Sequence, residues 1–135
     1  MHVPSLLEVA RSAPPYWPAG VDSIIRSAAD EPVILVPHSN AGLYVPAVVE
    51  ALGEQVRGVV FIDAALPGAG HYTPPEFLRR PSVGYIWFGE PYDKGATQAA
   101  KRGWPTVHLP GGHLHMLKDP DALAATVVEI AGDWL

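Results

Sequence analysis

The stretch Val33-Ile34-Leu35-Val36-Pro37-His38-Ser39-Asn40-Ala41-Gly42 decides how the rest of the chain is interpreted. Its first five residues are apolar throughout, which is typical of a strand buried on both faces of a parallel sheet. The run ends at a serine with small neighbours, and an apolar pattern suited to a buried helix continues to Leu52. The stretch therefore predicts a strand, a sharp turn with Ser39 at its apex, and a helix.

Such a turn is the geometry of a nucleophile elbow, in which the serine hydroxyl projects from the sheet and the next backbone N–H can face an oxyanion. The usual pattern is G-x-S-x-G. Here Pro37 and Ala41 occupy the glycine positions, and Gly42 comes one place later. A serine after a buried strand is also a common helix N-cap, so this segment alone leaves both interpretations open.

Composition narrows the class of protein. The 135 residues are 48% hydrophobic, which suits one globular domain over residues 1–135. A net charge of −5 without a Lys/Arg cluster argues against a nucleic-acid or anionic-membrane partner. There is no cysteine, no signal-peptide pattern at the N-terminus and no apolar run long enough to span a bilayer. We therefore expect a cytoplasmic protein that binds a small molecule.

Apolar strand patterns alternate with helical patterns along the chain, which predicts an α/β fold. We expect a mostly parallel sheet of about four to five strands with helices on both faces. Pro46 predicts a kink, or a helix that starts later than the elbow. The expected strands are 33–37, 56–66, 85–88 and 106–109; the expected helices are 20–30, 40–52, 94–102 and one from Pro120 onward; 13–18 is an expected extended loop, and 67–84 a short lid or crossing loop.

Chemistry-bearing residues follow the ends of these strands. They are Ser39, Asp63, Glu90, Asp93 and His113. Because the carboxyl ends of parallel strands meet at one crevice, one site could contain them all.

Three motifs in this order resemble those of the α/β-hydrolase superfamily, over nearly the whole chain from Glu31 onward. His38–Gly42 looks like its elbow, Gly89–Asp93 like its acid turn, and Gly112-His113 followed by Pro120 like its histidine loop and last helix. The resemblance implies a reduced three-layer sandwich of this family. Five segments of the chain together resemble a subgroup of bacterial hydrolase-like proteins. They are Pro4–Leu7, Pro14–Pro18, the elbow, Asp63–Pro67 and Gly112–His115.

By this resemblance, Ser39 would be the nucleophile, His113 the general base and then acid, and Asp93 the group that orients the imidazole, with the Asn40 N–H facing the oxyanion. A serine needs such an adjacent base held in one tautomer. Asp93 lies four residues after Gly89 where the family spacing is usually three, so Glu90 and Asp63 remain alternative acids.

The two histidines of the loop allow one other reading. His113 fits the distance to Pro120 better than His115, although both could be metal ligands. No third ligand is evident, so we predict neither a metal nor a cofactor. His38 beside the elbow is interpreted as structural.

Two functions stay open. The first is a serine hydrolase, esterase-like, that acts on a small ester, thioester or lactone through a Ser-His-Asp triad. The second is a hydrolase-fold protein used for cyclase, isomerase or lyase chemistry or for binding a small apolar molecule.

Superfamily members carry strands before the elbow strand and a loop that supplies a second oxyanion N–H. The residues of this sequence include neither of these. The resulting open edge of strand 33–37 predicts a homodimer.

Overall fold

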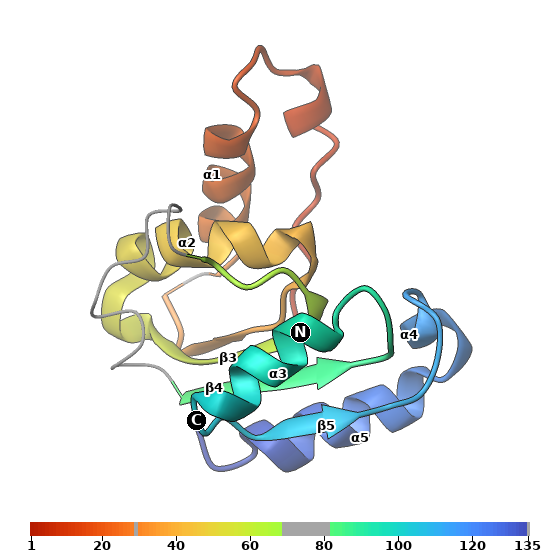
Figure 1. Ribbon diagram of the computed structural model, residues 1–135. Coiled ribbons are helices and arrows are strands. Elements are labelled where there is room, and N and C mark those ends of the chain that lie inside the picture. The colour runs from red at the N-terminus through yellow and green to blue at the C-terminus, as the bar shows by residue number, and fades with distance from the viewer. Residues whose placement is uncertain (29, 69–81, 135) are drawn as a thin grey trace.

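The computed structural model describes residues 1–28, 30–68 and 82–134 (Figure 1). The strands are β1 (Val33–Leu35), β2 (His38–Ser39), β3 (Val56–Ala64), β4 (Ser82–Trp87) and β5 (Thr106–His108). The α-helices are α1 (Trp17–Ser27), α2 (Val45–Leu52), α3 (Asp93–Lys101), α4 (His115–Lys118) and α5 (Pro120–Ala131). Short 3-10 helices are η1 (Val9–Arg11), η2 (Asn40–Tyr44) and η3 (Gly53–Gln55).

The strands form one sheet in the order β1-β3-β4-β5, and β2 continues beside β3 beyond the end of β1. All of these pairs are parallel. Parallel strands need crossover connections, and helices supply them. The predicted fold class, a mostly parallel sheet of four to five strands with helices, is confirmed.

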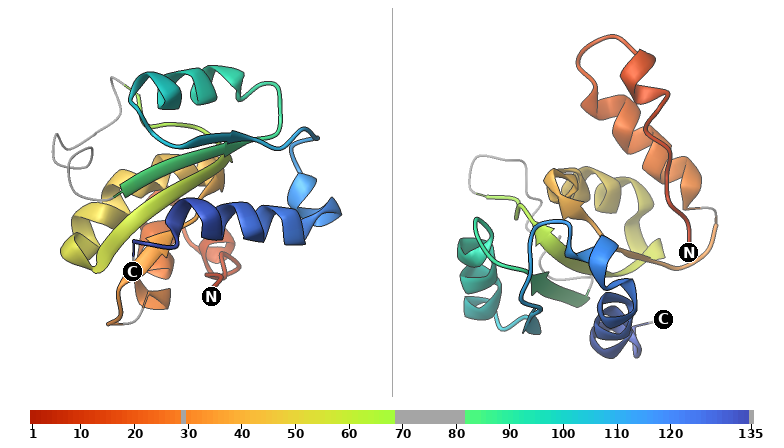
Figure 2. Two further views of the ribbon diagram at one scale, coloured as in Figure 1. Left: turned by 90° about the horizontal axis from the view of Figure 1, so that it is seen from below. Right: turned by 90° about the vertical axis from the view of Figure 1, so that its right-hand side faces the viewer.

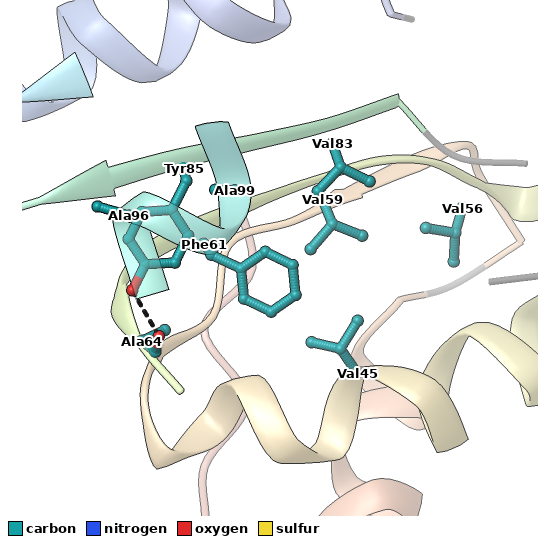
Figure 3. Close-up of a cluster of buried hydrophobic side chains, with 9 residues drawn as sticks. All are labelled: Val45, Val56, Val59, Phe61, Ala64, Val83, Tyr85, Ala96 and Ala99. Atoms are coloured by element: carbon teal, nitrogen blue, oxygen red, sulfur yellow. Dashed lines mark hydrogen bonds between the residues drawn. The ribbon is translucent and has the colours of Figure 1, made fainter. Parts of the chain in front are cut away.

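The central strand β3 is buried on both faces of the sheet. All of its residues except Arg57 are buried. Val59 and Phe61 belong to a cluster with Val45 of α2, together with side chains of α3 (Figure 3). Val60 belongs to a second cluster with side chains of α5. Alternate residues of β3 thus point to opposite faces, with α2 and α3 on one and α5 on the other (Figure 2).

Tyr85 of β4 anchors the first cluster at its polar end. The ring is fully buried, and its hydroxyl donates to the Ala64 carbonyl at 2.7 Å (Figure 3). Burial raises the pKa of Tyr85, because the phenolate would lose its hydration. The bond ties β4 to the end of β3, where the candidate site lies.

Several element bounds differ from those predicted. The helix expected over 40–52 divides into η2 and α2, which starts at Val45 with Pro46 in its first turn, so the predicted late start is confirmed. The extended loop at 13–18 ends sooner than expected. Trp17 begins α1, because Pro18 fits a first turn in which its missing N–H is not needed.

The region between β3 and β4 was predicted as a lid over 67–84. Residues 69–81 of it lie outside the described residues, and Ser82 already belongs to β4. Within the described parts of the chain, no helix is long and apolar enough to cross a membrane.

Candidate active site

The turn after β2 has the strained backbone of an elbow. Ser39 has φ 57° and ψ −132°, values that a residue with a side chain rarely adopts. Such strain persists only where surrounding structure holds it, and it is concentrated at functional sites. The Ser39 carbonyl accepts from Ala65 N–H at 3.0 Å. A Cβ on Gly42 would lie 2.0 Å from the Ala65 carbonyl oxygen, so the chain after the elbow can pass β3 only with glycine at this position.

Three side chains from distant parts of the sequence meet at this turn. Ser39 Oγ lies 3.0 Å from His113 Nε2. His113 Nδ1 lies 2.5 Å from Asp63 Oδ2. The second oxygen of Asp63 accepts the backbone N–H of Phe88 at 2.9 Å. Both oxygens of this carboxylate therefore have partners, as a side chain that is only 1% exposed requires.

One arrangement of protons satisfies both hydrogen bonds of the imidazole. An ionised carboxylate only accepts, so His113 Nδ1–H donates to Asp63. In the neutral imidazole Nε2 then has no proton and accepts from the Ser39 hydroxyl. The arrangement is one in which a base is held in a single tautomer next to a hydroxyl group.

The acid next to the imidazole is Asp63, which the sequence analysis gave as an alternative to Asp93. Asp63 is at the end of β3, the strand that pairs with β2, so its carboxylate starts beside the elbow. Asp93 is the first residue of α3, is exposed, and accepts the indole N–H of Trp87 at 3.1 Å. Glu90 lies exposed in the preceding turn. The structure thus brings Asp63 to His113 and directs Asp93 elsewhere.

Two aromatic rings fix the imidazole of His113. His38 stacks on it with ring centroids 4.5 Å apart, and Tyr92 with centroids 5.0 Å apart. His38 Nε2–H also donates to the backbone carbonyl of His113 at 3.0 Å, which supports the structural role predicted for it. Gly111 N–H donates to the Phe88 carbonyl at 3.0 Å, so the loops after β4 and β5 lie together at the carboxyl end of the sheet (Figure 1).

Sequence reasoning missed the contact of the Tyr92 hydroxyl with this site. It lies 3.2 Å from Ser39 Oγ. In the sequence, Tyr92 is one residue of the segment Gly89–Asp93, for which only the two acids were considered. Its position directly before the helix after β4 is the signal that could have identified it, because that position faces the carboxyl end of the sheet.

An open depression adjoins the elbow on the side of α1 and α2. Its volume is about 400 Å³, and two of its lining side chains, Trp17 and Leu43, are exposed. It is lined by Trp17, Asn40, Leu43, Tyr44 and Ala47. Asn40 follows Ser39 directly and begins η2, where backbone N–H groups lack helical partners.

His115, the other histidine of the loop, does not join this group. Its ring packs 5.3 Å from that of Phe88, and its Nδ1 is buried without a hydrogen-bond partner. Among the residues that the structure describes, no group of three or more His, Cys, Asp or Glu could hold a metal ion.

Comparisons with known proteins agree with this chemistry at a coarse level. No family model matches the chain. Two curated proteins named probable esterase PIR7A, from Oryza sativa subsp. indica and subsp. japonica, are each 35% identical to it over 63 residues. These residues are 44% of this chain and 24% of each relative, so the chain spans about a quarter of the length of the relatives it matches. The similarity and the parallel α/β sheet are compatible with an α/β-hydrolase.

Proposed function

We propose that this chain is a serine hydrolase that acts on a small ester, thioester or lactone, with Ser39, His113 and Asp63 in the roles of nucleophile, base and orienting acid. The observation that carries the proposal is the pair of hydrogen bonds that joins Ser39 Oγ to His113 Nε2 and His113 Nδ1 to Asp63 Oδ2. A hydroxyl is a weak nucleophile until a base removes its proton, and this arrangement supplies the base.

In the first half of the reaction, Oγ attacks the carbonyl carbon and its proton passes to His113 Nε2. The resulting imidazolium is stabilised by the Asp63 carboxylate, which keeps its charge. The Asn40 N–H, next to Ser39 at the start of η2, donates to the carbonyl oxygen as it becomes negative. His113 then gives the proton to the leaving oxygen or sulfur, and an acyl-enzyme remains.

In the second half, water enters in place of the leaving group. His113 Nε2 takes a proton from it, the hydroxide adds to the acyl carbon, and Ser39 leaves with that proton restored. The depression beside Asn40 suits a small apolar group, because the apolar side chains of Trp17, Leu43 and Ala47 line it. We assign it to the acyl part of the substrate.

Ser39→Ala tests this function. Hydrolysis of p-nitrophenyl acetate and butyrate should fall by about 10³-fold or more, because the group that forms the acyl-enzyme is lost. A fluorophosphonate probe should modify Ser39 in the unaltered chain, as located by mass spectrometry. Ser82→Ala, an exposed serine at the start of β4, is the control and should keep both activity and labelling.

Folding must be checked beside activity. The Ser39 hydroxyl is not part of the core, so circular dichroism and the melting temperature should match those of the unaltered chain. His113→Ala should be as inactive as Ser39→Ala, and His115→Ala should be milder. Ester hydrolysis by Ser39→Ala within roughly tenfold of the unaltered rate contradicts the nucleophile assignment.

A further inference from the structure

Tyr92 is held at the site by its backbone and by its ring. Its N–H donates to the Gly89 carbonyl at 3.0 Å, and its carbonyl accepts the N–H of Ala96 in α3, also at 3.0 Å. The ring lies nearly parallel to that of His113, with an interplanar angle of 12°. The position of the hydroxyl is therefore determined by a helix start and a stacked ring, both of which limit its motion.

The direction of the Tyr92–Ser39 hydrogen bond follows from counting protons. The one proton of the Ser39 hydroxyl is used toward His113 Nε2, which is an acceptor because Nδ1–H donates to Asp63. Between Tyr92 and Ser39, 3.2 Å apart, the proton of the bond must then come from Tyr92. Tyr92 is the donor and Oγ the acceptor in the resting site.

This bond weakens once Ser39 reacts, because Oγ becomes an ester-type oxygen, which is a weaker acceptor than a hydroxyl. The oxygen that becomes negative is bonded to the same carbon, two covalent bonds from Oγ. The oxyanion therefore lies close to Oγ, which the Tyr92 hydroxyl already contacts.

We propose that Tyr92 is an oxyanion donor, which gives its O–H bond to the carbonyl oxygen of the tetrahedral adduct beside the Asn40 N–H. The proposal rests on the hydrolase function proposed above. Tyr92 keeps its proton throughout, so no atom or charge leaves it. The donor acts only where charge develops, and such interactions raise the rate rather than the affinity for substrate.

Tyr92→Phe separates the hydroxyl from the ring, because the phenylalanine ring can still stack on His113. With p-nitrophenyl esters, kcat should fall about 10²-fold while KM changes by less than about threefold. A trifluoromethyl ketone, which forms a tetrahedral adduct with a nucleophilic serine, should lose affinity by the same factor as kcat/KM. Tyr16→Phe removes an exposed hydroxyl before α1 and is the matched control.

A second form of the protein changes the donor without changing its shape. Site-specific 3,5-difluorotyrosine at position 92 loses its phenol proton at lower pH than tyrosine. The alkaline limb of the kcat profile should move to lower pH, because the phenolate cannot donate. A ring that only positions His113 predicts no such shift.

The outcomes separate the two proposals. Full inactivity of Ser39→Ala together with kcat of Tyr92→Phe within about threefold of the unaltered chain overturns the donor role and leaves the hydrolase function standing. A lower kcat of Tyr92→Phe with unchanged affinity for the ketone also overturns it. Activity of Ser39→Ala within roughly tenfold of that of the unaltered chain instead overturns the hydrolase function itself.

Discussion

Asp63 shows how both oxygens of a buried carboxyl group can find partners at the end of a strand. The side chain is only 1% exposed, so its oxygens need hydrogen-bond partners within the protein. One oxygen accepts from Phe88 N–H and the other from His113 Nδ1–H. These two hydrogen bonds leave neither oxygen unpaired and direct the carboxyl group at the imidazole.

Asp63→Asn tests this assignment against Asp93. The asparagine can still accept from Phe88, but its amide can present N–H to His113 and favour the wrong tautomer. We expect kcat to fall about 10⁴-fold, as for a triad acid replaced in this way. Asp93→Asn, which removes an exposed charge beside Trp87, should leave kcat within about threefold. The kinetics of the two variants with one ester measure the difference.

The reverse order of effects would show that Asp93 is the functional acid in solution. Urea unfolding of both variants at neutral pH is the companion measurement. It separates a loss of chemistry from a loss of fold, because Asp63 is a buried group and Asp93 is not.

The sequence predicts that Ser39 and His113 lie near each other better than it predicts which carboxylate lies beside them. Both belong to short motifs whose local geometry is set by neighbours in the chain. Which carboxylate lies next to the imidazole depends on the sheet order, and β3 rather than the turn after β4 lies beside β2. That order is a property of the folded sheet. The contact between Tyr92 and Ser39 spans 53 positions and escaped prediction for the same reason.

At the scale of elements, the elbow depends on how closely the chain after Ser39 passes β3. Pro46 correctly predicted a late helix start, because proline is favoured in a first helical turn and disfavoured further in. Nothing in the local pattern predicted α4, which has one turn and no buried residue. The position and length of such a short helix depend on the loops on either side of it.

Gly42→Ala tests the close approach of η2 to β3. The added Cβ would lie 2.0 Å from the Ala65 carbonyl oxygen, so either the elbow or the end of β3 must move. We expect the free energy of unfolding, measured in urea, to be about 1–3 kcal/mol lower than that of the unaltered chain. Ester hydrolysis should fall as well, because the shift displaces Ser39.

Gly68→Ala is the control for that change. Among the residues that the structure describes, none has an atom within 4 Å of the Cβ it would add. It should leave the unfolding free energy within about 0.5 kcal/mol. Equal stability of the two variants would mean that the elbow relaxes freely and that Gly42 is not required by packing.

At the scale of the whole molecule, the sheet order leaves β1 as a terminal strand. Within the described residues it pairs with β3 on one side only. The residues that follow it are apolar, and Val36 is 46% exposed. An edge with free N–H and C=O groups and no charged side chain is a template for pairing with another strand.

We therefore expect a two-fold dimer in which the β1 edges of two copies meet, because closed two-fold pairing is the commonest solution for such an edge. Light scattering at micromolar concentration should give twice the 14.4 kDa of one chain. Val36→Lys should return the mass to that of one chain, since a charge beside the strand opposes edge pairing. Val128→Lys, at a position on α5 that is 67% exposed, should leave the dimer intact. A mass near 14.4 kDa for the unaltered chain eliminates the dimer, and dissociation by both lysine variants would mean that charge, rather than the β1 edge, controls assembly.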